Sequence, residues 1–273
     1  MATQLKEKPT LEPVAQLCPK TLFGIKNLNI CYGDNLVLRD VSMDICRGSV
    51  TAIVGPSGCG KTSFLHSLNR LCEMSASCDM CGSIFYRGKN IYDRSFDVAK
   101  LRAEVGTIFQ TPTAFPMSIW NNLAFPLKEH GVRSKAEILG KVTKTLQDVG
   151  LWDEVKDRLD CPAEELSGGQ MQRLCIARAL VLEPSTLLMD EPCSSLDPIA
   201  SSTVEELILK LKESISIIIV THNLSQARRL SDYTALFWAD ESSGYLVEFD
   251  ETEKMFTRPS EELTTSYFKG EMG

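Results

Sequence analysis

The stretch "GPSGCGKT" at residues 55–62 has the spacing of a phosphate-binding loop. The apolar strand pattern "SVTAIVG" leads into it, and the helical pattern "KTSFLHSLNRL" follows it. Glycines in such a loop let backbone N–H groups point at phosphate oxygens, while Lys61 adds a full positive charge and the Thr62 hydroxyl can ligate Mg²⁺. A chance Lys-Thr after a glycine turn would lack these flanking elements. We predict that the nucleotide phosphates are bound by Gly55, Pro56, Ser57, Gly58, Cys59, Gly60, Lys61, Thr62 and Ser63.

A second group of candidate residues stands at the end of the run "LLMDEP". Its apolar residues predict a buried strand, which leaves Asp190 and Glu191 at the carboxyl edge of the sheet, where ligands bind in open α/β folds. Asp190 is placed to hold Mg²⁺, and Glu191 to orient or deprotonate an attacking water. A carboxylate is a weak base, so positioning and charge neutralisation must supply most of the rate. The alternative is a solvated acidic loop, which the phosphate loop argues against.

The elements that must position these residues alternate between strands and helices. Residues 21–46 predict two antiparallel strands around the turn "GDN", and the later strands and helices predict a mainly parallel sheet covered on both faces. Amphipathic helical segments predict a helical subdomain at about 112–180, inserted in the α/β core. We therefore expect a polar lead-in at 1–20 and a single α/β domain of the P-loop NTPase type at 21–273.

Composition and charge narrow the class of protein. The formal net charge is −7 and the pI is near 5.2, which argues against a general nucleic-acid coat. No apolar run approaches the roughly 18–20 residues of a membrane span, and the first residues lack the apolar region of a signal peptide.

The ten cysteines are therefore expected to be free thiols of a cytosolic protein. Cys78 and Cys81 form a lone CxxC, with no second pair to complete a zinc site.

The motif "LSGGQ" at residues 166–170, together with the phosphate loop and "LLMDEP", resembles the ATPase subunits of ABC transporters. The resemblance covers nearly all of residues 21–270 and implies the ABC ATPase fold, with ATP and Mg²⁺ as cofactors. It also implies roles for residues that alone would mean little. Tyr32 matches the aromatic residue that stacks on adenine, Gln110 the glutamine that senses metal and water, and His222 the histidine that contacts the γ-phosphate. Residues 194–197, "SSLD", match the D-loop.

The resemblance also implies why the chain carries two phosphate-binding turns. ABC ATPases work as head-to-tail dimers, in which the signature motif of one subunit closes over the ATP bound by the other. We therefore expect a second copy of the chain as a partner, with the γ-phosphate gripped across the interface by Ser167, Gly168, Gly169 and Gln170. Arg173 and Arg178 behind this turn are expected to stabilise the fold.

Longer phrases such as "GGQMQRLCIARAL" and "MDEPCSSLDPIA" resemble the ATPases of bacterial phosphate-specific transport systems. This implies two integral membrane permease subunits as partners, an indirect link to a phosphate-binding protein, no nucleic-acid partner, and a peripheral location on the cytoplasmic face of the inner membrane. The segment "TPTAFPMS" departs from the pattern of that family in the region that docks on membrane subunits. Selection of the ion rests on the resemblance, since nothing in the chain is expected to bind phosphate as cargo.

Three alternatives stay open at this stage: an importer for another oxyanion or small solute, a soluble ABC ATPase that acts on nucleic acid, and a regulatory module without turnover.

Two further expectations concern single segments. Apolar residues of 115–127 either receive a membrane subunit or pack the core of the helical subdomain, and they are Phe115, Met117, Ile119, Trp120 and Phe125. The thiol of Cys59 is expected to react with alkylating agents and to be shielded by bound ATP.

Overall fold

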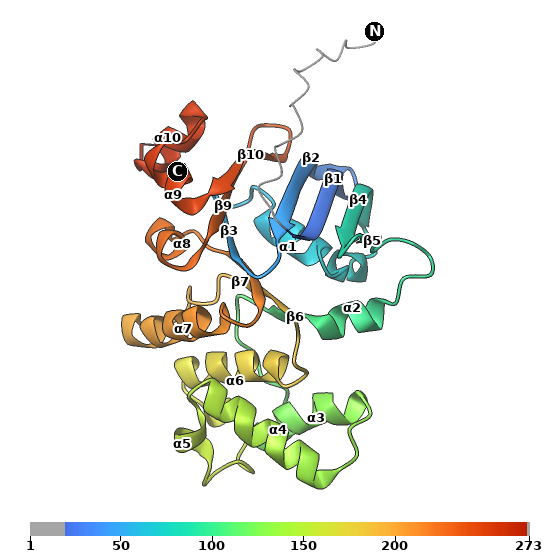
Figure 1. The fold of residues 1–273 in the computed structure, drawn as a ribbon, viewed down its shortest axis with the longest axis vertical. Coiled ribbons are helices and arrows are strands. Elements are labelled where there is room, and N and C mark those ends of the chain that lie inside the picture. Colours follow the sequence, from blue (N-terminus) through green and yellow to red (C-terminus); the bar gives the residue numbers. More distant parts are fainter. Residues whose placement is uncertain (1–19, 272–273) are drawn as a thin grey trace.

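The computed structural model describes residues 20–271, so the lead-in predicted at 1–20 lies outside the described residues except for its last position. The described part contains a single curled sheet of ten strands, in the order β5-β4-β1-β2-β10-β9-β3-β8-β7-β6 (Figure 1). The strands are β1 (Thr21–Tyr32), β2 (Asn35–Cys46), β3 (Val50–Val54), β4 (Cys78–Tyr86), β5 (Lys89–Asn90), β6 (Val105–Ile108), β7 (Thr186–Asp190), β8 (Ser216–Val220), β9 (Tyr233–Ala239) and β10 (Gly244–Glu251).

The helices lie on both sides of this sheet and beyond its β6 edge. They are α1 (Lys61–Ser67), α2 (Val98–Glu104), α3 (Ile119–Glu129), α4 (Lys135–Asp148), α5 (Trp152–Val155), α6 (Gly168–Leu180), α7 (Pro198–Leu211), α8 (Leu224–Leu230), α9 (Thr252–Thr257) and α10 (Glu262–Phe268), with 3₁₀ turns at Leu71–Met74 and Ala163–Glu165. Within the described range, no helix combines the length and the apolar character needed to cross a bilayer.

The strand pairing confirms the predicted fold class. β1 and β2 form the expected antiparallel hairpin, in which Tyr32 faces Asn35. β3, β8, β7 and β6 run parallel to one another, and β9 and β10 form the expected antiparallel pair. The hairpin half and the parallel half meet where β10 lies beside β2, with a single residue pair, Gly244 and Leu38, in register.

The parallel strands read as short apolar runs because both of their faces are buried. In β8, Ile217 and Ile219 join one core cluster, while Ile218 and Val220 join the other on the opposite face. Successive side chains of the strand point to opposite faces of the sheet, so the same strand contributes to two hydrophobic cores. This double burial makes the central strands rigid supports for the loops at their carboxyl ends.

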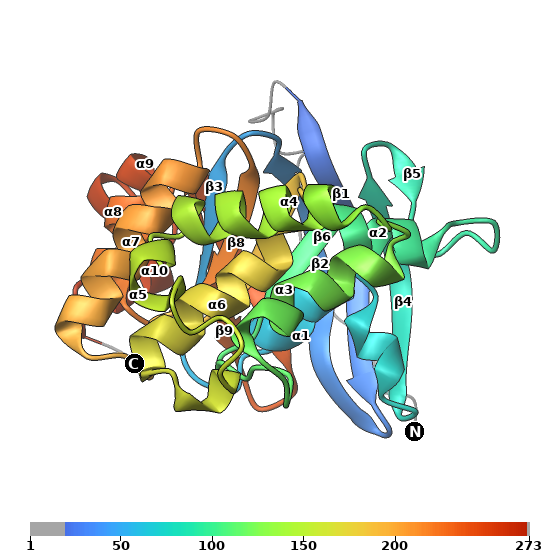
Figure 2. The ribbon, with the colours of Figure 1, turned by 90° about the horizontal axis from the view of Figure 1, so that it is seen from below.

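Helices α3–α6 gather at one end of the molecule, past β6 and β7, as the lower part of Figure 1 shows. Seen from below, α3, α4 and α6 stack as one layer in front of the sheet (Figure 2). Their apolar faces share the core cluster that also covers one side of the parallel strands. This arrangement agrees with the amphipathic pattern that predicted helices in the middle of the chain.

Several details differ from the expected elements. The helix after the phosphate loop ends at Ser67, because Arg70 adopts a left-handed conformation with φ 63°. The segment 252–268, for which the sequence made no prediction, forms the two short helices α9 and α10.

Candidate nucleotide site

The phosphate loop connects β3 to α1 at the carboxyl edge of the parallel strands. At two positions of the loop only glycine fits, because neighbouring atoms leave no room for a side chain. A Cβ on Gly55, whose φ is +144°, would lie 2.1 Å from the carbonyl oxygen of Phe237, and a Cβ on Gly60, with φ +89°, would lie 2.6 Å from a methyl of Leu38. The loop is therefore pressed against β9 and β2, which fixes its path.

Lys61 is buried at the start of α1 and its ammonium group is turned back over the loop. Nζ donates hydrogen bonds to the carbonyl oxygens of Gly55 at 2.9 Å and Pro56 at 2.7 Å. A phosphate that enters the loop must draw the ammonium away from these carbonyls or share it with them. The position suits the predicted role, because a buried cation interacts more strongly with an anion than an exposed one.

The surroundings of Cys59 do not fit the expectation that its thiol reacts readily. Its side chain has no exposed surface, and its sulfur lies 3.1 Å from the position that a Cβ on Gly55 would take. Burial raises the pKa of this thiol, although Lys61 opposes the shift. A buried thiol with a raised pKa is a poor nucleophile, so ready alkylation of Cys59 in the folded protein is no longer expected.

Among the cysteines that the structure describes, all but Cys46 follow the expectation of free thiols. Cys46 forms a disulfide bond, so the expectation is wrong at that position. The free cysteines of the described range are Cys31, Cys59, Cys72, Cys78, Cys81, Cys161, Cys175 and Cys193.

Asp190 ends β7 and lies against α1. It is 4% exposed, and its Oδ1 atom has no hydrogen-bond partner within the described part of the chain. Burial raises the pKa of this carboxyl, while a hydrogen bond from Thr62 lowers it. A buried carboxylate oxygen without a partner is costly, and a hard cation held with an oxygen ligand from Thr62 would relieve that cost. The donor set thus fits Mg²⁺.

Glu191 brings together the catalytic candidates. Its Oε2 atom lies 3.0 Å from Nε2 of Gln110, which donates to it, and 3.3 Å from Nδ1 of His222. The backbone of Glu191 has φ +44°, a left-handed conformation that costs energy for a glutamate, and its N–H donates to the carbonyl oxygen of Val220 at 2.9 Å. The edges of three neighbouring strands therefore place these side chains around one carboxylate oxygen.

Tyr32 stands at the end of β1, close to α1. Its hydroxyl donates to the sulfur of Cys72 at 3.7 Å. Burial raises its pKa to about 12, while a hydrogen bond with Ser63 lowers it. The phenol is thus anchored next to the residue that follows Lys61 and Thr62, and stacking of its ring on adenine stays a prediction.

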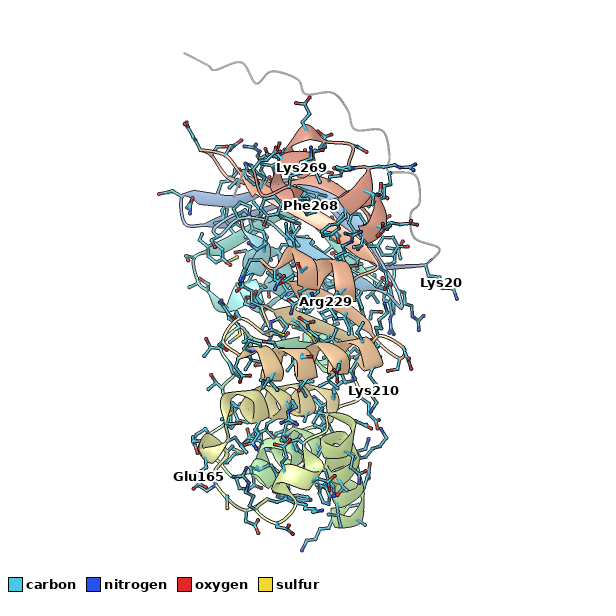
Figure 3. The ribbon with its side chains drawn as sticks, turned by 90° about the vertical axis from the view of Figure 1, so that its left-hand side faces the viewer. Lys20, Glu165, Lys210, Arg229, Phe268 and Lys269 are labelled. Carbon is cyan, nitrogen blue, oxygen red and sulfur yellow. The ribbon has the colours of Figure 1, made fainter. Side chains whose placement is uncertain are left out.

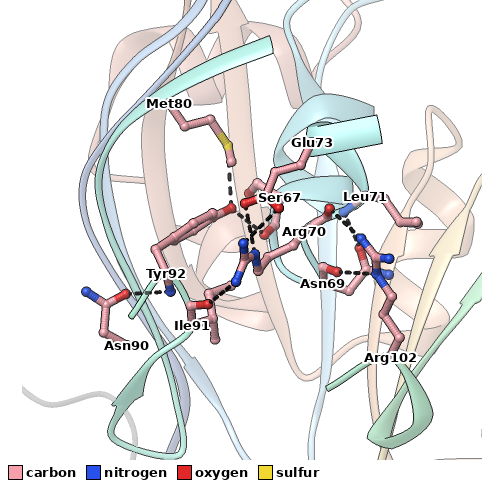
Figure 4. A network of polar contacts seen from close by, with 10 residues as sticks. All are labelled: Ser67, Asn69, Arg70, Leu71, Glu73, Met80, Asn90, Ile91, Tyr92 and Arg102. Atoms are coloured by element: carbon pink, nitrogen blue, oxygen red, sulfur yellow. Dashed lines mark hydrogen bonds and ion pairs between the residues drawn. The ribbon is translucent and has the colours of Figure 1, made fainter. Parts of the chain in front are cut away.

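A polar network fixes the far end of α1 (Figure 4). Arg70 donates to the carboxylate of Glu73 and to the carbonyl oxygen of Ile91, and its guanidinium lies over the ring of Tyr92. Arg102 of α2 donates to the carbonyl oxygen of Arg70 at 2.8 Å. The hydroxyl of Tyr92 donates to the carbonyl oxygen of Ser67, one of the carbonyls that the end of α1 leaves unsatisfied, at 3.2 Å, so the far end of the helix that carries Lys61 is held in place.

The signature motif opens α6 with a capping box. The hydroxyl of Ser167 accepts from the backbone N–H of Gln170, whose side-chain oxygen accepts from the N–H of Ser167. The amide nitrogen of Gln170 donates to Glu154 at 2.7 Å, and Arg173 pairs with the same carboxylate at 2.8 Å. Gln170 therefore shapes the turn in this chain, and its expected contact with a phosphate stays a prediction.

The two glycines of the signature have different surroundings. A Cβ on Gly169 would lie 2.9 Å from the Cβ of Ala200 in the first turn of α7, whereas a Cβ on Gly168 would meet nothing closer than Leu196 at 3.9 Å. Gly169 thus lets α6 approach α7. The signature belongs to the helical end of the molecule, away from α1 and its phosphate loop (Figure 1).

The apolar residues predicted at 115–127 divide into two groups. Ile119 is buried in the core, while Phe115 and Phe125 are 39% and 43% exposed and meet edge to face. The guanidinium of Arg178 lies 4.2 Å from the centre of the Phe115 ring and donates to the carbonyl oxygen of Thr113. The structural role expected for Arg178 is confirmed by these contacts.

A family model described as "ABC transporter" matches residues 38–194, from β2 through the phosphate loop and the signature to the loop after β7. The chain belongs to the ABC transporter family. The resemblance drawn from the sequence is confirmed, and membership of this family of ATPases implies the use of ATP.

Curated relatives of this ABC ATPase match over almost the full chain. The protein named Phosphate import ATP-binding protein PstB 1 of Nitrosococcus oceani is 53% identical over 255 residues, with 93% of this chain and 92% of the relative covered. The PstB of Bacillus cereus is 47% identical over 270 residues, with 99% and 97% covered.

Solved structures share the fold of this ABC ATPase. CbiO1 of Clostridium perfringens, described as part of the ABC transporter complex cbiONQ, superposes with a TM-score of 0.74 at 29% identity, covering 88% of this chain and 92% of that one. A bacterial Atm1-family ABC exporter with ATP bound gives a TM-score of 0.74 at 25% identity, covering 93% of this chain and 43% of the exporter.

Proposed function

We propose that this ABC ATPase drives an importer of inorganic phosphate. The observation that carries the proposal is the likeness to proteins named phosphate import ATP-binding proteins, which extends over 93% of the chain at 53% identity. The arrangement of Lys61, Asp190 and Glu191 supports a hydrolytic motor, and the uninterrupted likeness to importers disfavours a soluble ATPase acting on nucleic acid.

In this proposal each chain binds one ATP and closes over that of a second copy. Tyr32 contacts the adenine, and the phosphate-loop backbone with Lys61 and Thr62 holds the phosphates. Bound Mg²⁺, held by Asp190 and Thr62 with Gln110 nearby, would neutralise phosphate charge. Because Ser167 and Gly168 open α6 at the other end of the molecule, they serve the nucleotide of the partner.

Glu191 takes the role of general base in this scheme. Its Oε2 atom, flanked by Gln110 and His222, accepts a proton from the attacking water, and the two neighbours hold the carboxylate in place. His222, with a 63% exposed side chain, is also free to donate toward the γ-phosphate. The chemistry relies on positioning, since a carboxylate is a weak base.

We further propose that two copies dock on two integral membrane permease subunits at the cytoplasmic face of the inner membrane, which makes the chain a peripheral protein. A phosphate-binding protein outside the membrane would then be an indirect partner. Phe115 and Phe125 supply an exposed aromatic surface for a membrane subunit next to the helical layer.

Uptake of radiolabelled phosphate tests the cargo. Cells that depend on this chain are compared with cells that carry Glu191→Gln, with Ser225→Ala as a matched surface control. Loss of phosphate uptake in Glu191→Gln, with normal uptake in the control, supports phosphate import. Unchanged phosphate uptake together with loss of ATP hydrolysis would show that the motor serves another oxyanion or small solute.

A further inference from the structure

A cavity of about 550 Å³ lies between α7 and α8, beside the catalytic candidates. Glu191 and His222 line one side of it, and Gln226, Glu205 and Arg229 line another. A layer of polar side chains thus lies beside the cavity, directly behind the loop that carries His222. None of these contacts was predicted from the sequence.

Gln226 is the buried centre of this layer. It is 3% exposed, its Oε1 atom accepts from the hydroxyl of Thr221 at 2.7 Å, and its Nε2 atom donates to Oε1 of Glu205 at 3.1 Å. Buried hydrogen bonds of this kind are strong in a low dielectric, and breaking one leaves its partner unsatisfied. Both ends of the amide are therefore committed to a fixed geometry.

On one side the network holds the two residues that flank His222. The hydroxyl of Thr221 accepts from the N–H of Asn223 at 3.0 Å, and the side chain of Asn223 accepts from the N–H of Gln226 at 3.0 Å. The side chain of His222 is itself largely exposed and contacts Glu191. The backbone on both sides of His222 is thus held by Gln226, through its side chain at Thr221 and through its main-chain N–H at Asn223.

On the other side the network reaches α7, which begins at the D-loop. Glu205 is held by the guanidinium of Arg229, with contacts of 2.8 and 3.0 Å. Figure 3 shows Arg229 on α8, above α7 and its Lys210. Gln226 also contacts Cys193, two residues after Glu191. The side-chain amide of Gln226 therefore contacts three segments: the loop that carries His222, the loop after Glu191, and α7.

We propose that Gln226 is a positioning residue for ATP hydrolysis, which holds His222 at the distance from Glu191 that the reaction needs. The inference rests on the proposed roles of Glu191 and His222 and does not depend on the transported ion. Because Gln226 touches neither nucleotide nor the attacking water in this account, its loss should lower kcat and leave the KM for ATP nearly unchanged.

Steady-state ATP hydrolysis by the purified full chain tests this inference, with Ser225→Ala on the exposed side of α8 as the control. Gln226→Leu keeps the approximate size and removes both side-chain hydrogen bonds. We expect kcat to fall about 10-fold, since small misplacements of catalytic groups cost up to about 100-fold, with the KM for ATP within about twofold of the wild type. A wild-type kcat in Gln226→Leu would overturn the inference.

A side-chain exchange separates positioning from a general loss of structure. Gln226→Glu alone sets two carboxylates together and should lower kcat. Combining it with Glu205→Gln restores a donor opposite an acceptor between these two side chains, while the remaining amide oxygen can still accept from Arg229, so kcat should rise above that of Gln226→Glu. If the double variant stays as slow as Gln226→Glu while its thermal midpoint matches the wild type, the inference is wrong.

The wild-type and Glu191→Gln chains are measured in the same assay. If the wild type hydrolyses ATP, Glu191→Gln does not, and the Gln226 variants match the wild type, the positioning role alone fails. If the wild type shows no hydrolysis above Glu191→Gln, the proposed motor function fails, and the positioning role is overturned with it.

Discussion

The amide nitrogen of Gln110 lies 3.0 Å from Oε2 of Glu191, although 81 positions separate the two residues in the chain. The contact exists because β6 and β7 are parallel neighbours in the sheet, so the loops at their carboxyl ends meet. Under the proposed mechanism, Gln110 can thereby transmit the binding of nucleotide to the carboxylate of Glu191, the proposed base. The same edge brings in His222 after β8.

Gln110→Ala should lower kcat for ATP hydrolysis about 10-fold, because Glu191 loses the donor that orients Oε2, and general-base catalysis as a whole contributes about 100- to 10,000-fold. Steady-state kinetics at saturating ATP and Mg²⁺ measure the change. A conservative Gln110→Glu variant places two carboxylates together and should be slower still. An unchanged kcat in Gln110→Ala would contradict the role given to this contact.

Gly169→Ala should destabilise the fold by about 1–3 kcal/mol, the usual cost of overpacking, because the new Cβ would lie 2.9 Å from the Cβ of Ala200. Gly168→Ala, where the nearest atom is 3.9 Å away, is the matched control and should cost little. Urea unfolding of the two variants gives the comparison. Adding Ala200→Gly to Gly169→Ala should recover part of the loss, and equal stability of the two single variants would refute this packing account.

Asp190→Asn should raise the thermal midpoint while it abolishes ATP hydrolysis. Burial raises the pKa of Asp190, so the ionised carboxylate opposes folding at pH values above its folded pKa. The neutral amide removes that cost. The increase in thermal midpoint should therefore be seen at pH 7. It should shrink as pH falls through the folded pKa of Asp190, where the wild-type carboxyl becomes protonated. A lower midpoint at pH 7 would show that the carboxylate supports the fold.

Asp240→Asn tests the link between the two halves of the sheet. Oδ2 of Asp240, after β9, lies 2.5 Å from Nη2 of Arg39 in β2. The guanidinium holds the pKa of Asp240 well below its usual value of 3.8, so its contribution to stability is present above that pH and is lost as pH falls further. The variant should melt below the wild type at pH 7, with the gap closing below about pH 3.8. A gap that does not change with pH would argue against the ion pair.

Much of the fold and the set of candidate residues could be predicted from the sequence because each motif is local. The phosphate loop needs glycines and Lys61 within eight positions, and the apolar runs before it and before Asp190 predict buried strands. The alternation of strands and helices along the chain predicted that the central strands run parallel in one sheet.

The rest depended on residues far apart in the chain. Gly169 is required by Ala200, and Gln170 is occupied by Glu154, so neither role can be read from "LSGGQ" alone. The burial of Cys59 arises from the packing of the loop against other strands. The contact of Gln226 with Glu205 had one weak signal, a glutamine on the apolar face of α8, which periodicity could have marked as buried.

The most direct test of the central claim is the association state of Glu191→Gln with and without ATP, followed by light scattering on the purified chain. The amide keeps the shape of the side chain and removes the base, so ATP should remain unhydrolysed between two copies. The account predicts a monomer without nucleotide and a stable dimer with ATP and Mg²⁺, which the further change Ser167→Arg abolishes. A chain that binds ATP and remains a monomer would contradict the shared nucleotide site.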